Sequence, residues 1–284
     1  MVSFLWRLRK TIKQCGGIID GEEANVILGM GGFTSFPPVV AGAKKGLRTY
    51  VHDSNAIPGR SNRMTAKRCI AVLVGLEEAS AHFPNIKVIH TGTPVRDELE
   101  KLPSRQAACE KFGLDPLKKT LLVMGGSQGA RRLNELVAEG TEGSAWQVLH
   151  LAGQMDFERL SEQVGNRDGY KILAFCEDMA AAYAASDFCV ARSGASSLTE
   201  LSHVGLPALL VPFPFAADDH QTANARVFEK AGAAILTHEK DLKAKTITDI
   251  LSELDDGTLE SMSQSILNLA VPDAAAQIVN VIEG

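Results

Sequence analysis

Two turns rich in glycine and serine impose the strongest constraint on how this chain can fold. The first is GGSQG at residues 125–129, and the second is RSGASS at residues 192–197. Each follows an apolar run typical of a buried strand and precedes a segment with helical patterning. Such a strand–turn–helix connection leaves unpaired backbone N–H groups at the positive end of the helix dipole, where phosphate binds well. Two such turns in one domain suggest a nucleotide site.

Short apolar runs alternate with helical segments along almost the whole chain. We expect two series of strands. The first series begins with a strand that runs from Asn25 to the glycines at 29–32, followed by strands at 48–52, 70–75 and 86–90. The second series lies at 120–125, 147–151, 171–174, 188–191, 208–211 and 234–236. This alternation is typical of βαβ units and of a parallel sheet covered on both faces. A Gly-Pro turn interrupts it, so we predict two doubly wound α/β domains joined near residues 92–96. Ligands of such sheets bind at the carboxyl ends of the strands.

Composition excludes several functional classes. The chain has 284 residues, 45% of them hydrophobic, which is enough for two α/β domains with real cores. Its net charge of -5 argues against a general nucleic-acid binder. The five cysteines are scattered without zinc-ligand spacing, as expected for reduced thiols in a cytoplasmic protein. We find no membrane-spanning run and no signal peptide, and therefore expect neither secretion nor a membrane span.

The first residues predict a basic amphipathic helix over 3–15. Phe4, Leu8 and Ile12 fall on one face with Leu5 beside them, and four basic residues lie elsewhere. Two interpretations remain open here. The helix packs on a sheet as an ordinary surface helix, or it contacts an anionic membrane surface.

The two turns carry the first candidate binding residues. Ser127 offers a hydroxyl beside a helix that we expect to begin near Ala130, although the spacing matches neither the P-loop nor the dinucleotide motif, and a ligand-free tight turn is the alternative. After the second turn, Glu200 falls on the expected first turn of a helix, where its carboxylate could accept both hydroxyls of a ribose. Ser197 to Glu200 also matches a capping box, which would make Glu200 a structural residue.

Two further polar clusters follow expected strands. The loop after residue 211 contains Asp218, Asp219, His220, Gln221 and Asn224 at the end where a sugar would lie, and a solvated helix start with aspartate caps is the alternative. Its acidic residues and histidine are too close in sequence to surround one metal ion, so we expect no metal. Earlier in the chain, His52, Asp53 and Asn55 cluster at a strand end, either as hydrogen-bonded structure or as catalytic groups.

Seven ordered blocks resemble one known family. The blocks are GMGGFTS, HDSNAIPG, GTPVR, GGSQGARRLN, DMAAAYAASD, RSGASSLTE and PFAADDHQTANA. They closely resemble the bacterial UDP-N-acetylglucosamine transferases that make lipid II for peptidoglycan, the MurG family. The resemblance covers nearly the whole chain and implies a GT-B fold, with two Rossmann-like domains facing each other across a cleft. Residues 1–94 would form the acceptor-side domain, 95–268 the UDP-sugar domain, and 269–284 a helix that packs back on the first domain.

The resemblance also implies the reaction. N-acetylglucosamine would move from UDP-N-acetylglucosamine to the muramyl 4-hydroxyl of the undecaprenyl-linked muramyl-pentapeptide acceptor, with inversion and without a metal or other cofactor. The enzyme would act in the cytoplasm on the inner face of the cell membrane. It would attach peripherally to an anionic membrane surface through Leu5, Trp6, Phe33, Phe36 and nearby basic residues.

Matching positions carry the family's donor site onto this chain. The loop of Ser127 would hold the diphosphate together with Arg96, and Glu200 would bind the ribose. Cys176, Met179 and Ala195 would frame the uracil. Gln221, His220 and Asn55 would contact the N-acetylglucosamine. The assigned donor-binding residues are Asn55, Arg96, Gly126, Ser127, Gln128, Cys176, Met179, Ala195, Ser196, Glu200, His220 and Gln221, with Phe33 on the acceptor side.

The chain departs from the family pattern at its start. Family members begin with a strand and a GGTGGH-type loop whose histidine is a candidate base, and this chain has no such loop. We therefore expect about 70 residues and two or three strands to be missing, which would expose apolar sheet edges. The catalytic base stays unassigned. The usual His-Glu-Gln-Asn is also His52-Asp53-Ser54-Asn55 here, which weakens any role carried over to Asp53 and Ser54.

Three other hypotheses compete with a complete transferase. The chain could be a non-catalytic UDP-sugar-binding subunit that needs a partner chain for its acceptor half. It could be a UDP-sugar 2-epimerase, which shares the GT-B architecture, but the order of GGSQGA and SGASSLTE argues against this. It could also be a truncated remnant.

Overall fold

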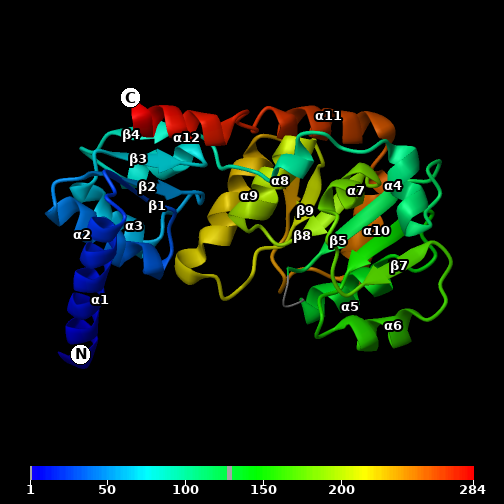
Figure 1. Ribbon diagram of the computed structural model, residues 1–284. Helices are drawn as coiled ribbons and strands as arrows, with labels where there is room; N and C mark the ends of the chain where they lie inside the picture. Colours follow the sequence, from blue (N-terminus) through cyan, green and yellow to red (C-terminus); the bar gives the residue numbers. More distant parts are fainter. Residues whose placement is uncertain (1, 127–129) are drawn as a thin grey trace. The chain divides into compact units, whose positions relative to one another are not determined.

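The computed structural model describes residues 2–126 and 130–284 and divides them into two compact units (Figure 1). The first unit consists of residues 1–94 together with 271–284, and the second of residues 95–270. Each unit contains one parallel β-sheet with helices packed against it, so the predicted α/β class is confirmed. Every strand that the apolar runs predict is present.

The first unit contains a four-stranded sheet in the order β1-β2-β3-β4. Its strands are β1 (Val26–Gly29), β2 (Arg48–Asp53), β3 (Ala71–Val74) and β4 (Val88–His90). Its helices are α1 (Val2–Gly21), α2 (Phe36–Lys44), α3 (Arg60–Thr65) and α12 (Ala274–Glu283), with short 3₁₀ helices at Phe33–Ser35, Ala66–Arg68 and Glu77–His82. All four residues of β3 are buried, as expected for a central strand of a covered parallel sheet. Val39 of α2, Val51, Val72 and Phe83 form the centre of its core.

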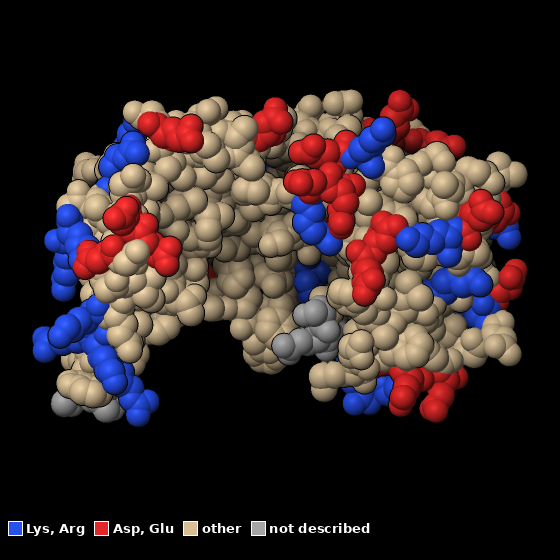
Figure 2. Space-filling model, viewed as in Figure 1, with Lys and Arg blue, Asp and Glu red and all other residues tan. Residues whose placement is uncertain are grey.

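Helix α1 is longer than predicted, because it continues through Gly16 and Gly17 to Gly21. Tertiary contacts hold this extension in place. Ile19 is buried, and Asp20 forms an ion pair of 2.6 Å with Lys45 just after α2. The last turns of α1 therefore pack against α2, while its first turns are exposed. Lys and Arg side chains gather over α1, at the lower left of Figure 2.

The second unit contains a six-stranded sheet in the order β10-β9-β8-β5-β6-β7. Its strands are β5 (Thr120–Met124), β6 (Gln147–Leu151), β7 (Tyr170–Leu173), β8 (Phe188–Ala191), β9 (Ala208–Leu210) and β10 (Ala234–Leu236). Its helices are α4 (Arg105–Phe112), α5 (Arg131–Gly140), α6 (Phe157–Val164), α7 (Met179–Ala184), α8 (Ala195–Val204), α9 (His220–Lys230), α10 (Ala244–Glu253) and α11 (Asp256–Leu267), with 3₁₀ helices at Asp97–Leu99 and Ala217–Asp219. The strand order reverses between β5 and β8. Both glycine-rich turns follow these two strands, which places them at the topological switch point, where ligands of such sheets bind.

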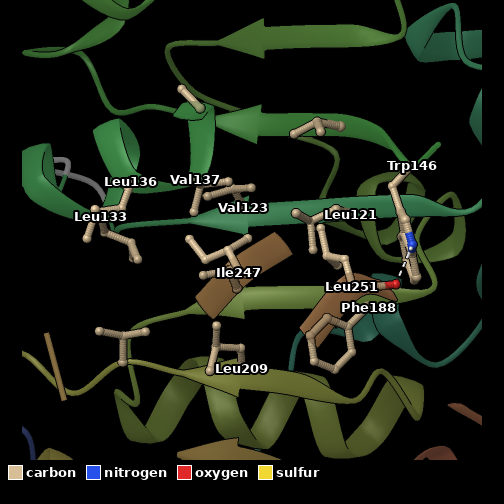
Figure 3. Close-up of a cluster of buried hydrophobic side chains, with 14 of the residues drawn as sticks. Leu121, Val123, Leu133, Leu136, Val137, Trp146, Phe188, Leu209, Ile247 and Leu251 are labelled. Carbon is tan, nitrogen blue, oxygen red and sulfur yellow. Dashed lines mark hydrogen bonds between the residues drawn. The ribbon is translucent and has the colours of Figure 1, made fainter. Parts of the chain in front are cut away.

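An apolar cluster between this sheet and two helices holds the second unit together (Figure 3). Leu121 and Val123 point from β5 toward Leu133 and Val137 of α5 and toward α10. Trp146 closes one end, where its indole N–H donates to the carbonyl of Leu251 at 3.1 Å. The core therefore anchors β5 and α5, the two elements that flank the first glycine-rich turn.

Candidate functional site

A cavity of about 230 Å³ opens at the carboxyl ends of β5, β6 and β7. It lies entirely within the second unit, beside the switch point between β5 and β8. Parallel strands end at one edge of a sheet, so three separate loops and two helices contribute to its walls. The lining residues are Arg96, Met124, Gly126, Leu151, Gly153, Ala174, Phe175, Cys176, Met179, Tyr183, Ser197 and Glu200.

Glu200 lies in the second turn of α8, which corrects the predicted position in the first turn. The helix begins at Ala195 and Gly194 is its N-cap residue, so Ser197 to Glu200 is not a capping box. Gly194 adopts an extended conformation (φ -66°, ψ 140°) that lets the helix start earlier than the serines suggest. The carboxylate of Glu200 is consequently available to the cavity, and it accepts hydrogen bonds from Tyr183 and Arg96.

Tyr183 is the residue with a polar contact to Glu200 that sequence reasoning missed, and Phe175 is a further lining residue that it did not assign. Its side chain is buried on α7, and its hydroxyl donates to Oε2 of Glu200 at 2.6 Å. Burial, and then the nearby Glu200 carboxylate, raise the pKa of Tyr183, so the hydroxyl stays protonated and acts as a donor. A signal was present in the sequence, because Tyr183 follows Met179 by four residues and therefore shares its helical face.

Arg96 supplies the positive charge of the cavity. It precedes the 3₁₀ helix Asp97–Leu99 and is half-exposed. One guanidinium nitrogen donates to Oε1 of Glu200 at 3.3 Å, and another contacts Oε1 of Glu98 at 2.9 Å. Glu98 does not line the cavity. The guanidinium therefore bridges two carboxylates, only one of which belongs to the site.

One wall of the cavity is apolar and is built around the start of α7. Phe175, Cys176 and Met179 line it, and burial raises the pKa of the Cys176 thiol. The thiol donates to the carbonyl of Asp178 at 3.2 Å. Asp178 caps α7 by accepting from the amide of Ala181 at 2.9 Å, and it forms an ion pair with Lys111 of α4. A hydrogen bond from Lys111 lowers the pKa of Asp178, so this cap stays charged at neutral pH. The wall is thus fixed in position.

The turn before α8 is held by the first residues of α9 and by the segments that follow β9 and β10. Ser193 donates from its hydroxyl to the carbonyl of Gln221 at 2.9 Å, and Asn224 donates to the carbonyl of Ser193 at 3.1 Å. Arg192 donates to the carbonyl of Val211 and forms an ion pair with Glu239. The first amides of α8 have no capping side chain at Gly194. The N-terminus of this helix is therefore a fixed source of N–H donors and positive potential.

The loop after β9 leads into α9, which begins at His220. His220 is partly exposed and donates from Nδ1 to the carbonyl of Ala217 at 2.7 Å. Oε1 of Gln221 accepts from the amide of Phe213 at 2.9 Å. Asp219, at the N-cap position, accepts from the Thr222 hydroxyl at 2.6 Å rather than from a backbone amide. Asp219 therefore occupies the N-cap position that the alternative of an aspartate cap implies, but its side chain does not cap a backbone amide of α9.

In the first unit, hydrogen bonds hold the cluster at the end of β2 in place. His52 is buried and donates from Nε2 to the carbonyl of Gly92 at 2.8 Å. Asp53 accepts from the amides of Asn55 and Gly59 and from the Asn62 side chain. These contacts fix the turn that carries Asn55.

Of the predicted donor-binding residues, the cavity brings together Arg96, Gly126, Cys176, Met179 and Glu200. Ala195 and Ser196 begin α8, and His220 and Gln221 begin α9. Asn55 and Phe33 belong to the first unit, and Ser127 and Gln128 lie outside the described residues.

In residues 2–126 and 130–284, no three His, Cys, Asp or Glu side chains gather closely enough to hold a metal ion. In the same part of the chain, no helix combines the length and apolar character needed to cross a membrane.

Comparison with known families matches both units. Residues 1–74 match the glycosyltransferase family 28 N-terminal domain, and residues 120–278 match the glycosyltransferase family 28 C-terminal domain. The UDP-N-acetylglucosamine–N-acetylmuramyl-(pentapeptide) pyrophosphoryl-undecaprenol N-acetylglucosamine transferase of Bacillus subtilis (strain 168) is 33% identical over 99% of this chain and 80% of its own length. The protein of the same name from Halorhodospira halophila is 36% identical over 98% of this chain and 78% of its own.

Solved structures give the same relationship. The crystal structure of Acinetobacter baumannii MurG superposes with a TM-score of 0.81 and 26% identity, covering 98% of this chain and 78% of that one. A UDP-GlcNAc 2-epimerase from Neisseria meningitidis, bound to UDP-GlcNAc, gives a TM-score of 0.72 over 97% of this chain and 81% of its own. Its identity of 12% shows a shared fold alone. The predicted GT-B architecture is therefore confirmed.

Proposed function

Because the chain belongs to glycosyltransferase family 28 and, within it, to the UDP-N-acetylglucosamine–N-acetylmuramyl-(pentapeptide) pyrophosphoryl-undecaprenol N-acetylglucosamine transferases, we propose how its residues carry out that transfer. The enzyme moves N-acetylglucosamine from UDP-N-acetylglucosamine to the lipid-linked muramyl pentapeptide, which converts lipid I to lipid II. The observation that carries this conclusion is identity of 33–36% to these transferases over 98–99% of the chain.

The cavity of the second unit is proposed as the uridine site. Its apolar wall of Phe175, Cys176 and Met179 suits a planar base. Glu200 suits the two ribose hydroxyls, since a carboxylate accepts two hydrogen bonds at once. Arg96 and the first amides of α8 suit the diphosphate, because both present positive potential and N–H donors. The sugar is assigned to His220, Gln221 and Asn55 by resemblance.

The proposed reaction is an inverting displacement without a metal. The muramyl 4-hydroxyl oxygen bonds to the anomeric carbon, while the bond from that carbon to the diphosphate oxygen breaks. The hydroxyl proton passes to a general base, and UDP leaves with the bonding electron pair. Arg96 and the N-terminus of α8 would stabilise the negative charge that grows on the diphosphate.

Glu200→Gln tests the donor site, with Glu98→Gln as its matched control. Each variant removes one carboxylate partner of Arg96, but only Glu200 lines the cavity. Loss of hydrogen bonds to a charged group costs about 1.5–3 kcal/mol, so we expect Glu200→Gln to weaken UDP-N-acetylglucosamine binding by about 10- to 100-fold. Isothermal titration is the measurement, with UDP-glucose as a comparison ligand.

The control should stay within about fivefold of the unaltered protein, because exposed ion pairs contribute at most about 1 kcal/mol. Equal losses in Glu200→Gln and Glu98→Gln would reject the ribose assignment. A folded protein that binds no UDP-N-acetylglucosamine would reject the donor site itself. Transfer to a lipid-linked acceptor, followed by UDP release, tests the reaction separately.

We further propose that the enzyme works in the cytoplasm and binds an anionic membrane surface peripherally through the start of α1. Phe4, Leu5 and Trp6 are 50%, 51% and 64% exposed, and the Phe4 ring lies 6.0 Å from that of the exposed Phe33. Lys and Arg side chains surround this apolar end (Figure 2). Exposed aromatic residues beside basic ones favour insertion at the headgroup level of acidic lipids.

The fluorescence of Trp6 can report this contact, because Trp6 is exposed and the other tryptophan, Trp146, is buried. In a Trp146→Phe background, we expect Trp6 emission to shift to the blue on addition of vesicles rich in phosphatidylglycerol. Phosphatidylcholine vesicles should have little effect, and added salt should weaken the shift. An unchanged spectrum with acidic vesicles would reject the proposal.

A further inference from the structure

The two oxygens of Glu200 have different partners. Oε2 accepts from the hydroxyl of Tyr183 at 2.6 Å, and Oε1 accepts from Arg96 at 3.3 Å. A short O–H···O⁻ bond to an ionised acceptor is among the strong hydrogen bonds in proteins, whereas 3.3 Å is long for a charged N–H donor. Oε2 of Glu200 is therefore held firmly by Tyr183, whereas the partner of Oε1, Arg96, can be replaced by another donor.

The Tyr183 side of the pair is rigid. Tyr183 is 3% exposed, and the three alanines that precede it on α7 are also buried. The start of α7 is fixed by the cap from Asp178, which Lys111 holds in turn. The hydroxyl of Tyr183 therefore has a defined position, from which it fixes the plane of the Glu200 carboxylate.

The Arg96 side can exchange. The Arg96 side chain is 47% exposed, and its guanidinium has a second acidic partner in Glu98 at 2.9 Å. When a ligand donates hydrogen bonds to Oε1, Arg96 keeps that second partner or turns to an anion. Glu200 can therefore lose its contact with Arg96 and still keep its hydrogen bond from Tyr183.

We propose that Tyr183 is a positioning residue that presents the Glu200 carboxylate to the vicinal diol of the ribose and so sets the preference for ribonucleotides over deoxyribonucleotides. This inference rests on the proposed uridine site. A carboxylate has about four lone-pair positions, and the tyrosine hydroxyl occupies one of them. Two ribose hydroxyls can use others without displacing Tyr183. Without that hydroxyl, the carboxylate must be ordered at the moment of binding, which weakens binding.

The experiment measures UDP and 2′-deoxy-UDP binding to the full chain and to Tyr183→Phe, which keeps the ring and removes the hydroxyl. We expect the full chain to prefer UDP. In the variant, UDP affinity should fall about tenfold and 2′-deoxy-UDP affinity less than twofold, so the preference shrinks. In the transfer assay, the KM for UDP-N-acetylglucosamine should rise while kcat stays near its original value, because the contact is remote from the anomeric carbon.

Tyr170→Phe is the matched control. Tyr170 is also buried in the second unit, and its hydroxyl donates to Nδ1 of His150 at 2.7 Å, away from the cavity. Its variant loses one buried hydrogen bond and should lose stability, but its preference for UDP should not change. Equal losses of UDP and 2′-deoxy-UDP affinity in Tyr183→Phe would show a merely structural role and overturn the inference.

A second measurement needs no substitution at Tyr183. The chain has three tyrosines, so carbon-13 labelling at the ring carbon that bears the hydroxyl gives three resonances, assigned with Tyr50→Phe and Tyr170→Phe. UDP should shift the Tyr183 resonance more than 2′-deoxy-UDP does at saturation. Equal shifts would overturn the inference. If the full chain binds neither nucleotide, the proposed uridine site fails, which is a distinct result.

Discussion

His52 and His150 are buried in the two units, and each is kept neutral by its surroundings. The carbonyl of Gly92 accepts from Nε2 of His52. His150 donates from Nε2 to Oδ1 of Asn134 at 3.1 Å and accepts from the Tyr170 hydroxyl at its other nitrogen. Burial lowers the pKa of His150 to about 3, and burial is also the main cause that lowers the pKa of His52.

Because the pKa values of both histidines are lowered in the native state, we expect the folded protein to lose stability in mild acid. Between the lowered pKa in the native state and about 6.5 in the unfolded chain, the unfolded chain binds more protons, so stability rises with pH across that window. From pH 7 to 5.5 we expect His150 to account for a loss of about 1 kcal/mol, with His52 adding in the same direction. Urea unfolding at pH 7.0, 6.0 and 5.5 measures this. A free energy of unfolding that does not change over this range would contradict the neutral assignment.

Residue-level prediction from sequence succeeded where a motif and its strand lie together. Gly126, Cys176 and Met179 line the cavity because each directly follows or lies near the end of an apolar strand. It failed where the partner is distant. The contact of Arg96 with Glu200 spans 104 positions, and the hydrogen bond from Tyr183 depends on how α7 and α8 pack. Hydrophobic periodicity carries no information about such contacts.

At the scale of elements, every strand could be predicted because a covered parallel strand is a short apolar run, and such runs are prominent in this sequence. Helix boundaries were harder. Helix α8 begins at Ala195 because Gly194 can adopt the cap conformation without a capping side chain, and α1 continues past two glycines because its last turns pack on α2. Local propensity is weak compared with these tertiary contacts.

Two glycine-to-alanine changes within helices of the first unit should have opposite effects. In Gly42→Ala on α2, the new methyl would lie 2.5 Å from Cγ1 of Ile27 and 3.2 Å from Thr49, so α2 must move from the sheet. We expect a loss of about 1–3 kcal/mol from overpacking. In Gly17→Ala on α1, nothing lies within 4 Å, and alanine should stabilise the helix by about 0.5–1 kcal/mol.

Denaturant unfolding of both variants, monitored by circular dichroism, measures this contrast. Both exchange a helical glycine for the same residue, so a general effect of glycine removal would shift them in the same direction. Equal shifts would show that α2 does not approach β1 as closely as the structure places it.

At the scale of the whole molecule, the first unit is built from two separate segments of the chain. Residues 271–284 belong with 1–94, and a side chain on Gly92, which has a φ of +70°, would lie 2.4 Å from Cβ of Val271. Alternating strands and helices predict two sheets, but they do not indicate that the chain returns to the first. The close approach of Val271 to Gly92 and the burial of Ala274 and Ile278 depend on residues that are far apart in sequence.

Residues 95–270 should fold alone and bind UDP. This segment has its own apolar core and six-stranded sheet, and all twelve residues lining the cavity lie within it. We therefore expect a cooperative thermal transition and a Kd for UDP within about threefold of the full chain, because every proposed uridine contact is retained. Glu200→Gln in the same fragment should reduce binding as it does in the full chain. A fragment that unfolds cooperatively but does not bind UDP, when the full chain does, would mean that the uridine site depends on residues outside 95–270.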